Sequence, residues 1–203
     1  VGRSLAFLLV LAILVGGTLA YLNRQQINDH FAAQRFEASA EIIELTNSLQ
    51  LTEAGHRIFW ASEPTLDASQ NFNEQCSQVE HSEEGHILGC FTRGRIHLFE
   101  VTDDRLHGIV EVTAAHEMLH AAFSRLGDSE RAALVRQLNN LYEELAPNNP
   151  ELEERMSVYS SLSKTAFANE LHSVLGTETR DLPGLLADHY ATWMEDSGTI
   201  LDF

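Results

Sequence analysis

Two histidines lie four residues apart near the middle of the chain, in the sequence His116-Glu117-Met118-Leu119-His120. Apolar residues around them recur at the spacing of one helical face, and alanines flank the segment, so residues 112–123 predict a helix with both histidines on its buried side. Two buried imidazoles one turn apart each need a polar partner, and a shared cation satisfies both. No other segment restricts the fold as strongly.

This spacing suits a metal ion. Residues four apart lie one above the other on a helix, so the imidazoles of His116 and His120 can converge on one cation. Glu117 then lies beside the metal, where it can take a proton from the attacking water and deliver it to the leaving amine. Imidazole and carboxylate ligands favour Zn²⁺, although Mn, Co or Fe fit the same ligand set. A chance match to the motif is the alternative, and it predicts no bound metal.

A catalytic zinc usually has three protein ligands, so the chain has to supply one more. Residues 167–174 predict a second helix, and Glu170 lies on its apolar face. A buried carboxylate needs a cation or several hydrogen-bond donors, and we therefore expect Glu170 to be the third ligand. The alternative is an ion pair with Arg155 or Arg180.

The two segments together carry a resemblance. His116-Glu117-Met118-Leu119-His120 and Asn169-Glu170-Leu171-His172-Ser173 resemble the motifs of the gluzincin zinc metallopeptidases, whose thermolysin-like members pair HExxH with a downstream NExxS helix. The spacing of 49 residues between His120 and Glu170 exceeds that of the thermolysin-like enzymes, so the resemblance is to zincins more broadly. It implies ligands at His116, His120 and Glu170, a general base at Glu117, and supporting roles for Asn169 and Ser173.

Three further side chains are weaker candidates. Tyr190 can donate its hydroxyl to the oxyanion that forms on the attacked carbonyl, and a tyrosine packed in the core is the alternative. His172 and His189 can substitute as a ligand or oxyanion donor, but His172 lies off the apolar face of its helix, so we expect both at the surface or behind the ligands. The remaining histidines show no ligand spacing, and we expect them in loops or facing solvent: His30, His56, His81, His86, His97 and His107.

The N-terminal segment is strongly apolar. Residues 4–21 form an 18-residue stretch without charge between Arg3 and Arg24, just long enough to cross a bilayer. Thr18-Leu19-Ala20 is an acceptable signal-peptide cleavage site, but the length of the apolar run favours an uncleaved transmembrane anchor over residues 1–24. A buried core helix is a poor alternative because the run has no polar face.

The only two cysteines are Cys76 and Cys90. A disulfide between them contributes about 3 kcal/mol in the chain-entropy description and suits a domain outside the cytoplasm. A zinc-binding pair lacks a second pair of ligands nearby, and two free thiols are the remaining alternative. We therefore expect a single-pass protein of the cell membrane with its catalytic domain on the extracytoplasmic side. The flanking arginines, one on each side, do not indicate the orientation.

The chain has a net charge of −17 with only 13 Lys and Arg. Such a surface repels the phosphates of nucleic acid and of anionic lipid beyond the anchor. We therefore expect a peptide or protein substrate and the membrane as partners, and no nucleic acid.

The rest of the chain predicts one folded unit. Residues 25–50 predict a helical stalk and residues 51–203 a single domain, in which a helix follows Thr52 and residues 65–85 are loop-like. Residues 86–92 and 95–101 predict antiparallel strands joined by a two-residue turn. The chain is then helical from the motif onward, with a break at 146–150 and a last helix after Pro183 that runs through Trp193.

These elements predict an α+β fold, mostly helical and zincin-like, with a small antiparallel sheet and an N-terminal transmembrane helix. The zincin resemblance implies that the strand 95–101 or its neighbour aligns an extended peptide. We therefore expect a membrane-anchored zinc metallopeptidase with Glu117 as general base. A catalytically inactive zincin-like binding or scaffold module of the cell envelope is the main alternative. An intramembrane protease is disfavoured because residues 112–123 lack the apolar length of a spanning helix.

Overall fold

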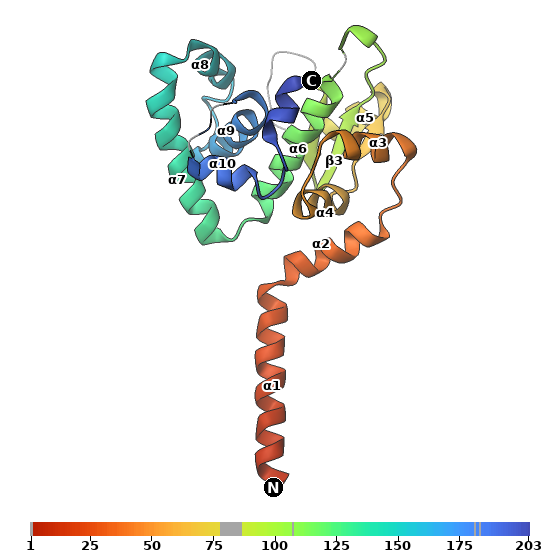
Figure 1. Cartoon of the computed structure of the whole chain (residues 1–203), viewed down its shortest axis with the longest axis vertical. Coiled ribbons are helices and arrows are strands. Elements are labelled where there is room, and N and C mark those ends of the chain that lie inside the picture. The colour runs from red at the N-terminus through yellow and green to blue at the C-terminus, as the bar shows by residue number, and fades with distance from the viewer. Residues whose placement is uncertain (1, 78–86, 107, 181, 183) are drawn as a thin grey trace.

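The computed structural model describes residues 2–77, 87–106, 108–180, 182 and 184–203. Helix α6 (Ile109–Arg125) runs through the middle of the folded part, between a half that contains the sheet and a half built from helices (Figure 1). The sheet half holds α3 (Ala40–Ser48), α4 (Glu53–Ala61) and α5 (Ser69–Cys76). The helical half holds α7 (Asp128–Leu145), α8 (Pro150–Ser157), α9 (Lys164–Glu178) and α10 (Gly184–Tyr190).

The sheet has three strands in the order β1-β3-β2. Strands β2 (Gly89–Thr92) and β3 (Arg95–Phe99) form the predicted antiparallel hairpin, which is confirmed. Its turn residues, Arg93 and Gly94, both have positive φ, of 52° and 81°, as a two-residue hairpin turn with the twist of the strands requires. Residue 86 of the predicted strand lies outside the described residues.

Strand β1 (Thr65–Asp67) was not predicted, and it changes the sheet type. It pairs with β3 in parallel, so the sheet is mixed and the prediction of an antiparallel sheet was wrong in this respect. Three residues are too short to show the alternation of apolar and polar side chains that marks a strand. Its pairing partner, β3, lies about 30 residues away, so no local turn sequence indicates the pairing either.

The predicted helices are present, with shifted ends. Thr52 caps α4 by accepting a hydrogen bond from the Gly55 amide, as its position before the helix suggested. The break at 146–150 is a short 3₁₀ turn, after which α8 continues the helical path. The last helix ends at Tyr190, earlier than predicted, and Pro183 lies outside the described residues.

The main core forms where α6 packs against α9. Ala114, Ala115 and Ala121 of α6 are fully buried, and such small side chains let neighbouring backbones approach closely. Gly176 of α9 has the same effect, because a Cβ at this position would lie 2.4 Å from a methyl carbon of Leu119. The close approach of the two helices brings their inward-facing polar residues together.

The predicted stalk divides into two parts. Ile42, Leu45 and Leu49, in and just after α3, belong to the main core, so this part of residues 25–50 is folded into the domain. Helix α2 (Arg24–Arg35) instead lies along the surface of the domain, where Asp29 is buried against Arg125 at the end of α6.

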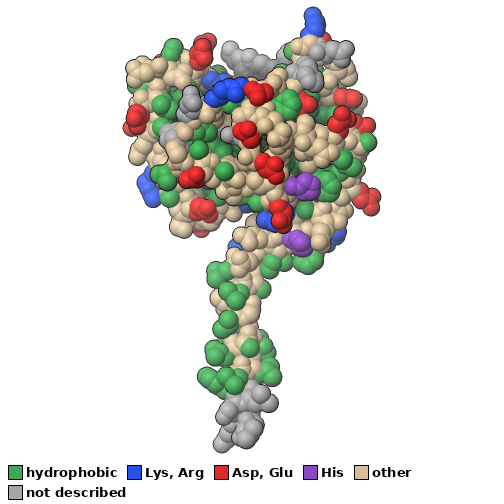
Figure 2. Space-filling model, viewed as in Figure 1, with side chains coloured by type: hydrophobic (Ala, Val, Ile, Leu, Met, Phe, Trp, Pro, Cys, Tyr) green, Lys and Arg blue, Asp and Glu red, His purple; other side chains and the backbone are tan. Residues whose placement is uncertain are grey.

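Helix α1 (Gly2–Leu22) projects away from the domain, and its apolar side chains are exposed from Phe7 onward (Figure 2). Within the described residues, no single helix is both long and apolar enough to span a membrane. Ala6–Leu22 and Arg24–Arg35 meet that criterion only as a pair, with a 66° bend between them.

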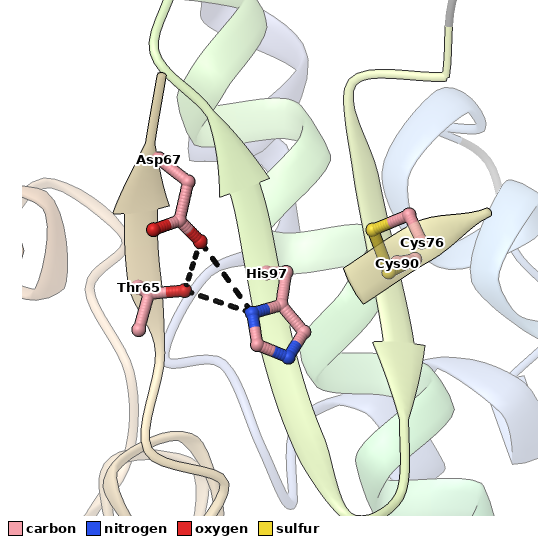
Figure 3. The surroundings of a disulfide bond; sticks show 5 residues. All are labelled: Thr65, Asp67, Cys76, Cys90 and His97. Carbon is pink, nitrogen blue, oxygen red and sulfur yellow. Dashed lines mark hydrogen bonds and ion pairs between the residues drawn. A yellow bond between two sulfur atoms is a disulfide. The ribbon is translucent and has the colours of Figure 1, made fainter. Parts of the chain in front are cut away.

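Cys76 and Cys90 are joined in a disulfide, which confirms the predicted pair (Figure 3). The bond links the end of α5 to β2. Phe72 and the two cysteines form a small second core, against which Ile87 and Phe99 pack.

His97 was expected in a loop or facing solvent, and this was wrong. It lies on the central strand β3 and is buried, with Nδ1 3.0 Å from Thr65 Oγ1 and 3.5 Å from Asp67 Oδ2 (Figure 3). Burial lowers the pKa of His97, although the hydrogen bond to Asp67 opposes the shift. His81, His86 and His107 lie outside the described residues.

Candidate metal centre

Helix α6 presents His116 and His120 on one face, and α9 brings Glu170 to the same point. The Nε2 atoms of the two histidines lie 3.1 Å apart. Glu170 Oε2 lies 3.8 Å from Nε2 of His116 and 3.5 Å from Nε2 of His120. In the described part of the chain, this is the one group of three or more His, Cys, Asp or Glu side chains close enough to hold a metal ion.

The three ligand atoms fit a zinc ion. Metal–ligand bonds of about 2.0–2.2 Å in tetrahedral geometry place ligand atoms roughly 3.3–3.5 Å apart. The three measured separations, 3.1, 3.5 and 3.8 Å, bracket that spacing. The donor set of two imidazoles and one carboxylate is also that of many catalytic zinc sites.

The site is buried, and its charges are strongly coupled. Burial lowers the pKa of His116 to about 4. Burial also disfavours the charged form of His120, but the hydrogen bond and charge of Glu170, together with the charge of Glu117, raise its pKa to about 9. Without a metal, one proton on His120 therefore balances the buried carboxylate, and a bound cation would take over that role.

Glu117 is only 6% exposed and lies next to the ligands on α6. Strand β2 packs directly over it: a Cβ at Gly89 would lie 2.9 Å from Glu117 Cγ and 2.5 Å from a methyl carbon of Thr113. Gly89 is therefore the residue that allows the strand to approach this face of the helix. The strand therefore lies directly against the Glu117 side chain.

The alternative partners of Glu170 make other contacts. Arg155 Nε lies 3.1 Å from Glu178 Oε1, and Arg180 pairs with Asp202. Glu170 is directed toward the two histidines, as the ligand prediction requires.

The two predicted supporting residues differ in their surroundings. Asn169 is the neighbour of Glu170 on α9 and one of the groups that raise the pKa of His120, but its side-chain oxygen makes no hydrogen bond with any of the described residues. Ser173 is buried, but its hydroxyl makes no hydrogen bond with any of the described residues. The supporting roles of Asn169 and Ser173 therefore stay predictions.

Tyr190 does not offer its hydroxyl to an oxyanion. The side chain is fully buried, and its hydroxyl donates a 2.6 Å hydrogen bond to the backbone carbonyl of His172. A phenol has one proton to donate, so this bond excludes the predicted catalytic role in the arrangement observed. The alternative, a core tyrosine, is correct, and burial raises the pKa of its hydroxyl.

His172 was expected at the surface or behind the ligands, but it is fully buried in the core. Its Nε2 lies 2.8 Å from Nε2 of His189 on α10, and its ring stacks on Tyr190. The helical spacing around residue 170 did not indicate that His172 is buried, because α9 is buried on nearly all sides and has no single apolar face.

The chain matches no protein-family model, no curated protein and no solved structure. The gluzincin resemblance therefore stays a prediction, which rests on the two motifs and on the site that they form.

Proposed function

We propose that the protein is a membrane-anchored zinc metallopeptidase. The observation that carries the proposal is the convergence of His116, His120 and Glu170 from two helices onto one buried point, with their ligand atoms within 4.8 Å of one another. His120 and Glu170 meet there although 49 residues separate them in the chain and neither helix by itself requires the contact. A buried carboxylate between two imidazoles is a stable arrangement when a cation is shared among them.

The residues around this point have separate tasks. His116, His120 and Glu170 would hold the zinc ion, and Asn169 would orient His120. The chemistry that a bound zinc supplies at such a site is activation of a water and polarisation of a carbonyl. Glu117 accepts the proton of the attacking water and passes it to the amine that leaves, so that the peptide bond breaks without a charged amide leaving group.

The open edge of the sheet suggests how a peptide is aligned. Because β3 lies between β1 and β2, β2 is the hairpin strand whose outer edge pairs with no other strand of the described residues, and it is the neighbour of the strand 95–101. Strand β2 also contacts Glu117 through Gly89. An extended peptide that added to this edge would lie across the site, held by main-chain hydrogen bonds.

The location of the enzyme is the remaining part of the proposal. The exposed apolar side chains of α1 have no partner within the described residues, and a lipid bilayer is the environment that suits them. The Cys76–Cys90 disulfide suits an oxidising compartment. Together these features support a catalytic domain on the extracytoplasmic side of the membrane.

The deciding experiment combines metal analysis with hydrolysis. Purified full-length protein in detergent would be analysed for bound metal and incubated with a mixture of unstructured peptides, whose cleavage is followed by mass spectrometry. We expect about one zinc per chain and new cleavage products. The Glu117→Gln variant should keep its zinc and lose at least about a hundredfold in cleavage rate, because a general base contributes roughly 10²–10⁴-fold.

The same variant separates the proposal from the inactive binding module. If wild type and Glu117→Gln both bind zinc and neither cleaves any peptide, the module is the better description. If the folded wild-type protein binds no metal, the resemblance to zincins is accidental.

A further inference from the structure

Helix α2 has one face packed on the domain and an opposite face that is largely exposed. On the packed face, Asp29 accepts hydrogen bonds from Arg125 Nε, at 3.0 Å to each carboxylate oxygen, and one from Gln25. On the opposite face, Ile27 and Phe31 lie one turn apart and are 40% and 53% exposed. The helix is therefore held firmly in an orientation that leaves two large apolar side chains outward.

The outward face also has the charge pattern of a helix at a lipid surface. Arg24 and Arg35 flank Ile27 and Phe31 on the helix, whereas Asp29, its one carboxylate, is turned to the domain. At the joint with α1, the guanidinium of Arg24 lies over the ring of Tyr21, 4.4 Å from its centroid. Aromatic and basic residues together are typical of the boundary between acyl chains and headgroups.

A cavity lies beside this face. It has a volume of about 510 Å³, and no carboxylate of a described residue lines it. Its one cation among the described residues, Arg57, lies 3.7 Å from Glu53, and the rest of the lining is mainly apolar, which suits the glycerol and upper acyl region of a lipid. The residues that line it are Asn23, Gln26, Ile27, His30, Phe31 and Arg57.

The bend between the helices places α2 at the right depth. Helix α1 has 21 residues and is about 32 Å long, and within the described residues its apolar part, Ala6–Leu22, meets the spanning criterion only together with α2. Under the membrane anchoring of the proposed function, α1 enters the bilayer and α2 begins where the chain reaches the headgroups. The bend of 66° then turns α2 away from the membrane normal and toward the bilayer plane, between α1 and the domain (Figure 1).

We infer that α2 is an interfacial helix, which lies in the headgroup layer with Ile27 and Phe31 directed toward the acyl chains and so docks the catalytic domain on the bilayer surface. This inference rests on the membrane anchoring in the proposed function. Two apolar side chains bind a free membrane weakly, but α1 keeps them at the surface, so that even a weak contact is populated.

Environment-sensitive fluorescence on the full-length protein tests the inference. Single cysteines at Ile27, Phe31, Leu14 and Glu144 would each carry an NBD group, since both native cysteines are in the disulfide. The labelled proteins would be placed in phosphatidylcholine nanodiscs with and without a doxyl-labelled lipid quencher. We expect blue-shifted, lipid-quenched emission at positions 27, 31 and 14, and water-like, unquenched emission at position 144.

Each other result has a defined meaning. Quenching at position 14 with water-like emission at 27 and 31 would overturn the interfacial helix but leave the anchor intact. Blue-shifted emission at 27 and 31 without lipid quenching would mean that protein, such as a second copy of the chain, covers the face. Water-like emission at position 14 as well would overturn the anchor and the inference together.

A second variant removes the apolar contact without placing a label there. A reporter cysteine at Gln34 in the Ile27→Ser, Phe31→Ser protein should lose the lipid quenching seen in the wild-type background. Leu185→Ser is the matched control, because Leu185 is also exposed but lies on α10, and it should leave the quenching unchanged. Equal zinc content in all variants shows that the fold is intact, and unchanged quenching in the double variant would contradict the inference.

Discussion

In the described part of the chain, two pairs of histidines bring their Nε2 atoms within about 3 Å of each other, and one of these pairs has the surroundings of a metal site. His116 and His120 are 3.1 Å apart and face Glu170, whereas His172 and His189 are 2.8 Å apart among aromatic rings. The carboxylate raises the pKa of His120, while burial lowers the pKa of His172 well below its ordinary value. Proximity of two imidazoles therefore does not define a cation site, and the third, negatively charged ligand does.

Removing one histidine from each pair tests which of the two pairs binds zinc. We expect His120→Ala to abolish zinc binding, because the remaining His116 and Glu170 provide too few ligands. His189→Ala should keep about one zinc per chain. Elemental analysis of the purified proteins measures both, and loss of zinc from His189→Ala with retention in His120→Ala would reverse the assignment.

The next largest effect should come from the carboxylate itself. Glu170→Gln keeps the shape of the side chain and removes its charge, so we expect the zinc affinity to fall by roughly a hundredfold, which corresponds to about 2.7 kcal/mol. Competition with a chelator of known affinity measures the change. Glu178→Gln is the matched control on the same helix, since Glu178 contacts Arg155, and an equal loss in both variants would rule out a specific role for Glu170.

The difference in pKa between the pairs predicts how zinc binding depends on pH. His120 holds a proton in the metal-free site up to about pH 9, and a ligand must be neutral, so binding at pH 7.5 should release about one proton. Apparent affinity should rise with pH up to about 9 and then level off. Calorimetry in buffers of different ionisation enthalpy measures the released proton.

Two variants sharpen the pH prediction. His189→Ala should release the same proton, whereas Glu170→Gln should release less, because the pKa of His120 falls without the neighbouring charge. Binding of zinc at pH 7.5 without proton release would contradict the coupling of His120 to Glu170.

The smallest expected effect concerns Glu117, the proposed general base next to His116. Gly89→Ala would force β2 away from Glu117 and Thr113, and we expect it to cost about 1–3 kcal/mol of unfolding free energy. Zinc should remain bound, while peptide cleavage slows. Thermal unfolding and metal analysis check this, and Gly127→Ala is the control, since a Cβ there meets nothing within 4 Å.

The sequence allowed prediction of the elements that have strong local signals. The motif helix, the hairpin with its Arg93-Gly94 turn and the cap at Thr52 all follow from patterns within a few residues. The three metal-binding candidates were also identifiable, because HExxH fixes two of them and a buried glutamate on a second helix demands a cation.

The missed features depend on contacts between distant segments. Strand β1 exists only through its parallel pairing with β3, and that pairing also buries His97 against Thr65 and Asp67. His172 and Tyr190 were misjudged for a related reason, since α10 covers the side of α9 that an isolated helix would expose. Local periodicity cannot reveal which face a later segment will cover.

The disulfide has a consequence for the candidate site. Among the described residues, the small core around Phe72 contains three buried residues, two of which are the bonded cysteines, so the disulfide is a large part of what holds α5 against the sheet. Cys90 is also the neighbour of Gly89, the residue that lies over Glu117. The disulfide therefore ties α5 to the strand that covers Glu117, so that a covalent bond as well as packing holds this strand in place.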